Sequence, residues 1–172
     1  MGLFDRFKKE STPDPVVVHI AADEAAAPAS GRAVGLAEVP DPVFSGGILG
    51  QGLGIWPEDG VCYAPVSGTI TATTGTNHAI GLTTDDGIEV LIHIGVDTVD
   101  MKGDGFRRMV ETDEHVDAGT PLITFDREKI KAAGHDDIVI CVISNTPEFA
   151  SVDPRAAGPV KAGEVAIKVT RK

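Results

Sequence analysis

Two histidines, His78 and His93, stand at the outer ends of a pattern typical of a β-hairpin. The apolar-rich runs 79–83 and 88–92 lie between them, separated by the turn-forming residues 84–87. A two-residue or four-residue loop would place the histidines directly opposite, with Cβ atoms about 4.5–5.5 Å apart. A tight turn over the last two loop residues would make them diagonal neighbours, about 7–8 Å apart. We expect one of these registers, because a three-residue loop would put the histidines on opposite faces.

Neighbouring imidazole rings can support more than one kind of chemistry. A neutral histidine has a free ring nitrogen near pH 7, so one ring could accept a phosphoryl group as a nucleophile. The other ring could then donate a hydrogen bond to the phosphoryl oxygens. The same pair could instead supply half of a zinc site, or be two ordinary cross-strand histidines. The spacing alone leaves these three alternatives open.

The surroundings of the pair favour a functional site. Thr76 precedes His78 and can fix its tautomer through a hydrogen bond. Gly95 follows His93 and leaves room for a partner to approach the backbone, while Asp97 could receive a basic side chain. Several apolar residues could form a rim on which another protein docks, or could equally belong to the core: Val43, Phe44, Leu49, Ile80 and Leu91.

The remaining histidines and the two cysteines are not expected to do chemistry. His19, His115 and His135 lie in linker-like or loop-like sequence, so we expect them to be solvated. Cys62 and Cys141 are far apart in the sequence, without the spacing of a metal or redox motif. Both lie in apolar runs typical of strands, which predicts buried free thiols in a reducing compartment.

Composition narrows the class of protein. The 172 residues carry a net charge of −11, from 15 Lys and Arg against 26 Asp and Glu. Nucleic-acid binding is not expected, because a phosphate-backbone binder needs clustered basic residues and the chain has no such cluster. The acidity suits basic protein partners, or solubility alone. No apolar run is long enough to span a membrane, and the charged first ten residues do not resemble a signal sequence.

Frequent turn residues, 20 Gly and 11 Pro, separate short apolar runs and predict an all-β fold. A helix is expected over 126–133, with Asp126 as its N-cap and Gly134 beyond its end, and a further helical turn or two between 97 and 110. Two sequence echoes, 27–31 with 64–68 and 116–119 with 160–163, indicate a duplicated β motif in one barrel or sandwich. The predicted strands are 32–37, 54–56, 61–64, 68–73, 78–83, 88–94, 122–125, 138–143 and 164–169.

The chain divides into three parts by composition. Residues 1–10 could form a short amphipathic helix, with Leu3, Phe4 and Phe7 on one face, that makes weak contact with a membrane surface. A frayed terminus is the alternative, because so short a helix is marginal in water. Residues 11–26 are rich in Ala, Pro and acidic side chains and are expected to form a flexible linker. The folded domain is expected over 27–172.

Six collinear motifs between residue 27 and the C-terminus resemble the glucose-type enzyme IIA of the phosphoenolpyruvate:sugar phosphotransferase system, the type-1 EIIA domain. The first residues, MGLFDRFKK, also look like the membrane-touching N-terminus of some members. The resemblance implies a duplicated-hybrid-motif antiparallel β-sandwich, or flattened barrel, with one or two short helices. It also implies a cytoplasmic protein that can lie at the inner membrane face. The motifs are VPDPVF (39–44), APVSGTI (64–70), TNHA (76–79), HIGVDTV (93–99), KGDGF (102–106) and VISN (142–145).

The resemblance also implies a role for each residue of the site. His93 matches the histidine that accepts phosphate on Nε2 from the small carrier HPr, and His78 matches the histidine that supports and passes it on. Thr76 matches the residue that hydrogen-bonds the supporting histidine. Asp41 and Asp97 match acidic positions at the docking surface, where arginines of partners approach. The chain would thus be a phosphotransferase component that needs no cofactor or metal.

The partners implied are HPr and the cysteine of a sugar-specific IIB domain in an EIIB/EIIC permease. Some relatives also control glycerol kinase, permeases or adenylate cyclase, and His78 and His93 could then bind zinc within a partner complex. Family members often carry phenylalanines around the site, whereas this chain has aliphatic or small residues, which predicts lower affinity for regulatory partners. These residues are Thr74, Ile80, Leu91 and Ile94.

Two other classes of protein compete with this interpretation. A lysostaphin-type zinc peptidase-like domain would need a third ligand and a second histidine two residues beyond the first. The residues two positions either side of His93 are Leu91 and Gly95, which weakens that alternative. A non-catalytic regulatory module of the biotinyl or lipoyl kind would carry a lysine at its hairpin tip. Residues 84–87 contain no lysine.

Overall fold

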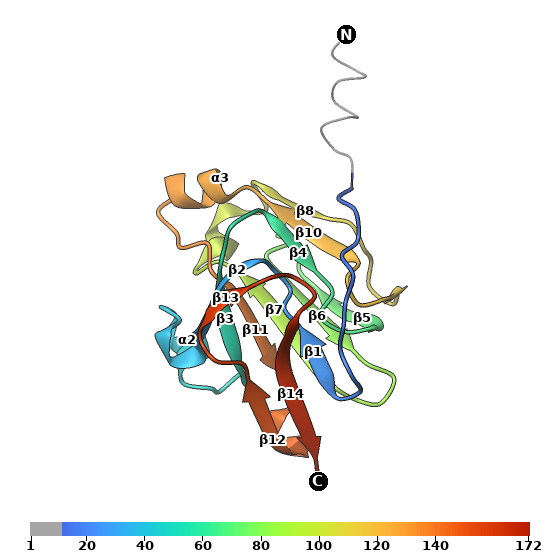
Figure 1. Cartoon of the computed structure of the whole chain (residues 1–172). Helices are drawn as coiled ribbons and strands as arrows, with labels where there is room; N and C mark the ends of the chain where they lie inside the picture. The colour runs from blue at the N-terminus through green and yellow to red at the C-terminus, as the bar shows by residue number, and fades with distance from the viewer. Residues whose placement is uncertain (1–11) are drawn as a thin grey trace.

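The computed structural model describes residues 12–172 and consists mainly of short strands joined by turns (Figure 1). Two short α-helices and three 3-10 segments interrupt them: α2 (Pro42–Ser45), α3 (Arg127–Ala132), η1 (Leu36–Glu38), η2 (Thr98–Met101) and η3 (Thr146–Glu148). The strands are β1 (Glu24–Ala26), β2 (Gly31–Gly35), β3 (Gln51–Pro57), β4 (Val61–Tyr63), β5 (Gly68–Thr73), β6 (Ala79–Thr83), β7 (Glu89–Ile94), β8 (Phe106–Arg108), β9 (His115–Val116), β10 (Pro121–Phe125), β11 (Val139–Ile143), β12 (Phe149–Pro154), β13 (Gly158–Val160) and β14 (Val165–Arg171).

These strands form one large and two small antiparallel sheets. The large sheet has eight strands in the order β13-β2-β3-β11-β7-β6-β5-β9. The small sheets have the orders β1-β14-β12 and β4-β10-β8, and Figure 1 shows the first of them in front of the large sheet. Apolar side chains between the layers make the main core. The expected all-β antiparallel sandwich with short helices is therefore confirmed.

The central strand β11 is buried on both of its faces, which explains its unbroken apolar sequence. Val139, Cys141 and Ile143 pack into the main core. The alternate residues Ile140 and Val142 pack into a second cluster on the other face of the sheet, together with Phe44 of α2 and residues around η1. This second cluster supports the histidine-bearing side of the sheet.

Both cysteines are free and fully buried, as predicted. Burial raises the pKa of the Cys62 thiol far above its ordinary value, and the nearby Cys141 raises it further. Burial also raises the pKa of Cys141, to about 12. Because the thiolate is the reactive form, neither side chain is set up as a nucleophile.

The helix predicted over 126–133 is observed as α3. Its N-cap is Asp126, whose carboxylate accepts a hydrogen bond from the backbone N–H of Lys129 at 3.1 Å. Gly134 has a positive φ of 84° just beyond the helix. The helical turn expected between 97 and 110 is the 3-10 segment η2.

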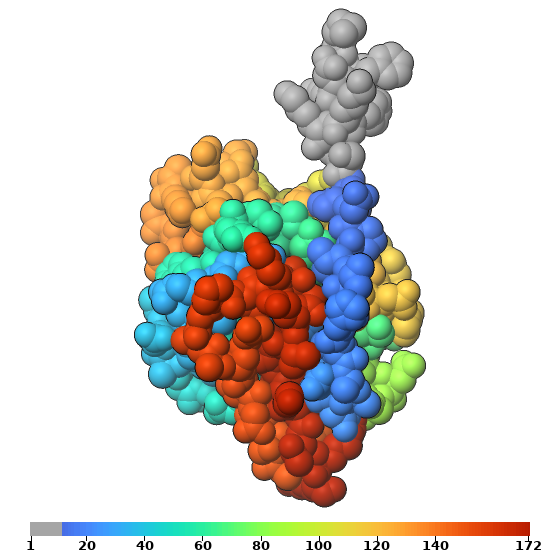
Figure 2. Space-filling view, in the orientation of Figure 1, coloured from blue at the N-terminus to red at the C-terminus, as the bar shows by residue number. Residues whose placement is uncertain are grey.

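The part of the expected linker that the structure describes lies against the domain. The N–H of Val16 donates to the carbonyl of Gly119 at 3.1 Å, and that of His19 to Gly163 at 3.4 Å. The two glycines hold equivalent places in the second sequence echo, and a Cβ on either would overlap a carbonyl of the N-terminal segment. Figure 2 shows this blue segment beside the red C-terminal strand, and its last residues form β1, paired with β14. This placement differs from the free linker that composition suggested.

Residues 1–10, for which a membrane-surface helix was hypothesised, lie outside the described residues. Within the described part, no helix is both long and apolar enough to cross a membrane.

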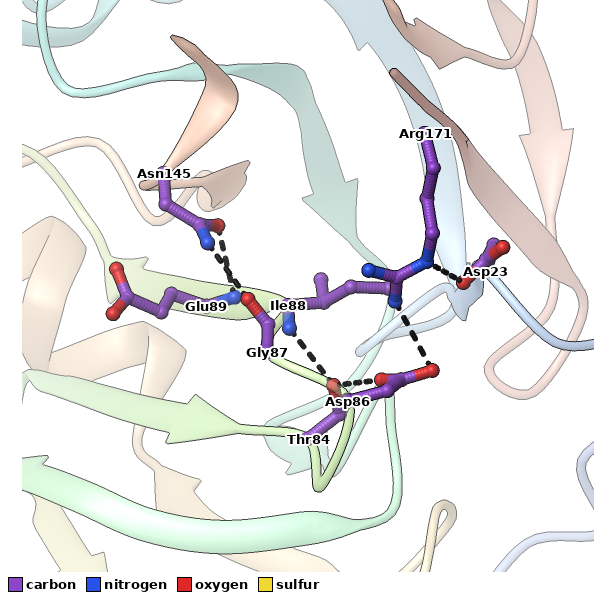
Figure 3. A network of polar contacts seen from close by, with 8 residues as sticks. All are labelled: Asp23, Thr84, Asp86, Gly87, Ile88, Glu89, Asn145 and Arg171. Carbon is purple, nitrogen blue, oxygen red and sulfur yellow. Dashed lines mark hydrogen bonds and ion pairs between the residues drawn. The ribbon is translucent and has the colours of Figure 1, made fainter. Parts of the chain in front are cut away.

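A polar network holds the tip of the β6–β7 hairpin (Figure 3). The buried side chain of Asn145 donates to the carbonyl of Gly87 at 2.7 Å and accepts from the N–H of Glu89 at 3.0 Å. Arg171 of β14 bridges Asp23 and Asp86, with N···O distances of 3.0 and 3.1 Å. The hairpin that carries His93 is thereby tied to strand β14 and, through Arg171, to Asp23 just before β1.

Candidate functional site

The hairpin register differs from the predicted one. Ala79 lies opposite His93, and the ladder continues without a break to Thr83 opposite Glu89. The N–H of Thr84 then donates to the carbonyl of Ile88 at 2.9 Å, which leaves a three-residue loop. This is the register in which strand alternation would separate the two histidines. Both predicted registers, which placed His78 and His93 on one face of the ladder either directly opposite or diagonally, were therefore wrong.

The imidazole rings nevertheless meet, because His78 stands outside the regular strand. It occupies a bend just before β6, directly after Asn77, whose φ is +59°. Side-chain alternation holds only while the backbone stays extended, so it does not govern His78. The ring centroids of His78 and His93 are 4.9 Å apart, with the planes at 81°. A backbone turn brings the pair together.

Each imidazole has one ring nitrogen occupied. Nδ1 of His93 is 2.9 Å from the carbonyl oxygen of Gly95. A carbonyl can only accept, so Nδ1 carries the proton and Nε2 of the neutral ring is left with a free lone pair. Nδ1 of His78 is 2.6 Å from Oγ1 of Thr76. If this hydroxyl donates, the proton of neutral His78 sits on Nε2.

Helix α2 supplies the wall beside His93. Asp41 caps this helix, and its carboxylate accepts a hydrogen bond from the N–H of Val43 at 3.0 Å. The cap places the Phe44 ring at 5.0 Å from the His93 ring, centroid to centroid, with Phe44 buried. Asp41 is thus engaged with its own helix and is itself largely buried.

A shallow depression of about 360 Å³ surrounds His93. Most of the expected rim residues line it, and Val43 and Leu49 are exposed there. Sequence reasoning missed Val99, which is half exposed. The available signal was that Val99 is the apolar last residue of the HIGVDTV motif, two positions after Asp97. The lining residues are Asp41, Val43, Phe44, Leu49, Ala79, Leu91, His93, Asp97 and Val99.

Ile80 was wrongly placed on the rim. It is 1% exposed and packs in the main core. The register explains the difference, because Ile80 lies opposite Ile92 and shares its inward face, whereas Ala79 shares the outward face of His93. The outward position nearest the site on β6 is thus occupied by a methyl group.

Burial sets the protonation state of the pair. Desolvation lowers the pKa of His93 below its ordinary value, and the neighbouring His78 lowers it further. The Gly95 carbonyl, Asp41 and Asp97 act in the opposite direction with smaller effect. Desolvation also lowers the pKa of His78. Both rings are therefore neutral at pH 7.

We expect the pKa of His93 to rise in the His78→Gln variant, because a charge that opposes protonation is removed. An NMR titration of the His93 imidazole in both proteins measures the change, and an unchanged His93 pKa in the variant would contradict this coupling.

The lowered pKa of His93 in the folded protein also affects stability. Between the folded and the unfolded pKa of His93 the unfolded chain binds more protons, so the free energy of unfolding rises with pH in that range. The contribution of His93 to stability should thus be lost as pH falls below about 6.5.

The described residues contain no group of three or more His, Cys, Asp or Glu side chains placed to hold a metal ion. His78 and His93 could supply two ligands of a site completed by another molecule.

Comparison with known proteins assigns this arrangement to a family. The profile of the phosphoenolpyruvate-dependent sugar phosphotransferase system EIIA 1 family matches residues 23–149. The glucose-specific EIIA component of Halalkalibacterium halodurans is 40% identical over 141 residues, which is 82% of each chain. The β-glucoside-specific EIIBCA component of Bacillus subtilis is 36% identical over 167 residues, 97% of this chain. The chain spans only 27% of that longer relative.

The fold agrees with that assignment. Glucose permease IIA from Mycoplasma capricolum superimposes with a TM-score of 0.72 at 36% sequence identity, covering 84% of this chain and 93% of that one. The expected resemblance is thereby confirmed: the chain is a glucose-type EIIA domain and belongs to the EIIA 1 family of the phosphoenolpyruvate-dependent sugar phosphotransferase system.

Proposed function

We propose that the chain is a phosphoryl carrier that takes phosphate from phospho-HPr on Nε2 of His93 and passes it to the cysteine of a sugar-specific IIB domain. The observation that carries this proposal is the state of His93. Its Nδ1 is held by the Gly95 carbonyl at 2.9 Å, its ring is neutral at pH 7, and its Nε2 is free within a shallow, accessible depression. A neutral imidazole with one free nitrogen is the form that attacks phosphorus.

The two transfers need little covalent machinery. In the first, the lone pair of His93 Nε2 forms a bond to phosphorus as the bond to the HPr donor nitrogen breaks, and that nitrogen keeps the electron pair. In the second, the thiolate of the IIB cysteine attacks the same phosphorus, and the electron pair returns to Nε2 of His93. Each acceptor replaces the leaving donor in line, so no water takes part.

We assign to His78 the role of stabilising the phosphoryl group on His93. Oγ1 of Thr76 lies 2.6 Å from Nδ1 of His78 and donates its hydrogen bond there. The proton of His78 is then on Nε2, where it can be donated to a phosphoryl oxygen. The centroid of this ring lies 4.9 Å from that of His93, close enough for His78 to reach a phosphoryl group on His93. A preorganised donor of this kind stabilises charge as it shifts during transfer.

The surroundings suit brief docking of basic partners. The depression combines exposed apolar side chains with the carboxylate of Asp97, in a chain of net charge −11. A small apolar patch with an acidic rim favours fast, weak association with a positively charged surface. Relatives whose names join an A component to B and C components, in Bacillus subtilis and Corynebacterium glutamicum, support a sugar-specific EIIB/EIIC partner.

The test is a reconstituted relay. Phosphoenolpyruvate labelled in its phosphate, with catalytic amounts of enzyme I and HPr, should load one acid-labile, alkali-stable phosphate onto each chain. Adding membranes that contain a cognate EIIB/EIIC permease and its sugar should then discharge the label to sugar phosphate. A chain that stays unlabelled while a known EIIA in the same mixture is labelled would refute the proposal.

A further inference from the structure

The Gly95 carbonyl that holds His93 is itself oriented by a neighbouring loop. This carbonyl and the N–H of Val96 belong to one planar peptide unit and point in opposite directions. The Val96 N–H donates to the carbonyl of Asp136 at 3.1 Å. That hydrogen bond fixes the peptide plane, and with it the direction in which the Gly95 oxygen faces Nδ1 of His93.

The loop is close-packed at this point. The N–H of Gly95 donates to the carbonyl of Ile138 at 2.7 Å, so two hydrogen bonds join residues 95–96 to residues 136–138. Gly95 has a positive φ of 78°, and a Cβ on it would come within 2.9 Å of the Asp136 carbonyl. A shift of the 136–138 backbone would therefore turn the Gly95 carbonyl.

An ion pair between a buried carboxylate and a partly exposed arginine anchors the 136–138 segment. The Asp137 carboxylate is 4% exposed, and its Oδ2 lies 2.8 Å from Nε of Arg127 in α3. Lys131, one turn further along the helix, has its Nζ at 3.8 Å from the same oxygen. The helix itself is anchored by Ile130, which is fully buried in the main core. A buried carboxylate without its cation would be driven to move toward water.

We propose that Asp137 and Arg127 are positioning residues for phosphoryl transfer: their ion pair holds the Asp136 carbonyl and, through the Val96–Gly95 peptide, keeps the proton of His93 on Nδ1. The inference rests on the proposed role of His93 as phosphoacceptor. Neither residue lines the depression around His93, so they act on the ring and not on docking.

The first test is the tautomer of His93, which needs no phosphate. In ¹⁵N-labelled wild-type protein, imidazole ¹H–¹⁵N correlation at neutral pH should show the Nδ1–H tautomer. In Asp137→Asn and in Arg127→Gln, the ratio of the Nδ1–H to the Nε2–H form should fall about fivefold, the effect of one weakened hydrogen bond. Arg127→Gln keeps Lys131 facing the carboxylate and covers the case in which Asp137→Asn does not fold.

Lys129→Gln is the matched control. Lys129 lies on the same helix and makes an ion pair of similar length, 2.9 Å, but its partner is the exposed Asp104, which is not part of the 136–138 segment. This variant should keep the wild-type tautomer ratio. In the relay, Arg127→Gln should lower kcat about tenfold with KM for phospho-HPr unchanged, as loss of an orienting partner does elsewhere.

A wild-type tautomer ratio in folded Arg127→Gln, or an equal change in Lys129→Gln, would overturn the inference. A wild-type chain that accepts no phosphate would defeat the proposed function instead, and the tautomer comparison would still decide the role of the ion pair.

Discussion

His93→Gln is expected to lower phosphate uptake from phospho-HPr by at least about 1,000-fold, because the variant lacks the only nucleophile that the proposal uses. Glutamine is close to histidine in volume and polarity, so the wall formed by Phe44 and Asp41 should stay in place. The measurement is the initial rate of label transfer to the chain in the reconstituted relay. Uptake of acid-labile phosphate at the wild-type rate would move the acceptor to another residue.

His78→Gln separates the two steps. Its amide can still donate to a phosphoryl oxygen, so we expect phosphate uptake within about tenfold of the wild-type rate. Onward transfer to IIB should fall more, about 100-fold, because glutamine cannot take up or release a proton as the charge shifts. The exposed His115 provides the control, and His115→Gln should match the wild-type chain in both steps. Blocked uptake with normal onward transfer in His78→Gln would reverse the roles of the pair.

Gly95→Ala is expected to lower both the stability of the domain and the rate of phosphate uptake. Its φ of 78° costs an L-residue about 1 kcal/mol. Its Cβ would also overlap the Thr98 methyl group and come within 2.9 Å of the Asp136 carbonyl oxygen. We expect the free energy of unfolding to fall by about 3 kcal/mol in total, measured by urea denaturation. Because the Gly95 carbonyl orients His93, phosphate uptake should fall about 100-fold in the folded variant.

Gly134→Ala isolates the conformational part of that cost. Gly134 has a similar φ of 84°, but a Cβ there would meet nothing within 4 Å. This variant should lose only about 1 kcal/mol and keep normal phosphate uptake. Equal losses in the two variants would show that the backbone conformation, and not the contact with residues 98 and 136, dominates at Gly95.

Several features were predictable because they depend on local sequence. The helix at α3 follows from Asp126 as N-cap and a glycine beyond its end, and Cys141 was placed in the core by the unbroken apolar run around it. The rim was less predictable. Ile80 and Leu91 look alike in the sequence, yet one lies in the core and the other lines the depression, because the loop length decides which residues face inward.

The sequence by itself determined the family, the all-β class and the identity of the two site histidines. Motifs and alternating apolar runs are properties of neighbouring residues, so they can be recognised without the fold. Only the tertiary structure decided how the histidines meet. The register of β6 and β7 would place the two side chains on opposite faces of the sheet. The bend at Asn77 and His78 instead brings the two ring centroids to 4.9 Å. The hydrogen bonds from residues 95–96 to residues 136–138 were likewise beyond sequence reasoning, because they join segments about forty residues apart through backbone atoms, which every residue type shares.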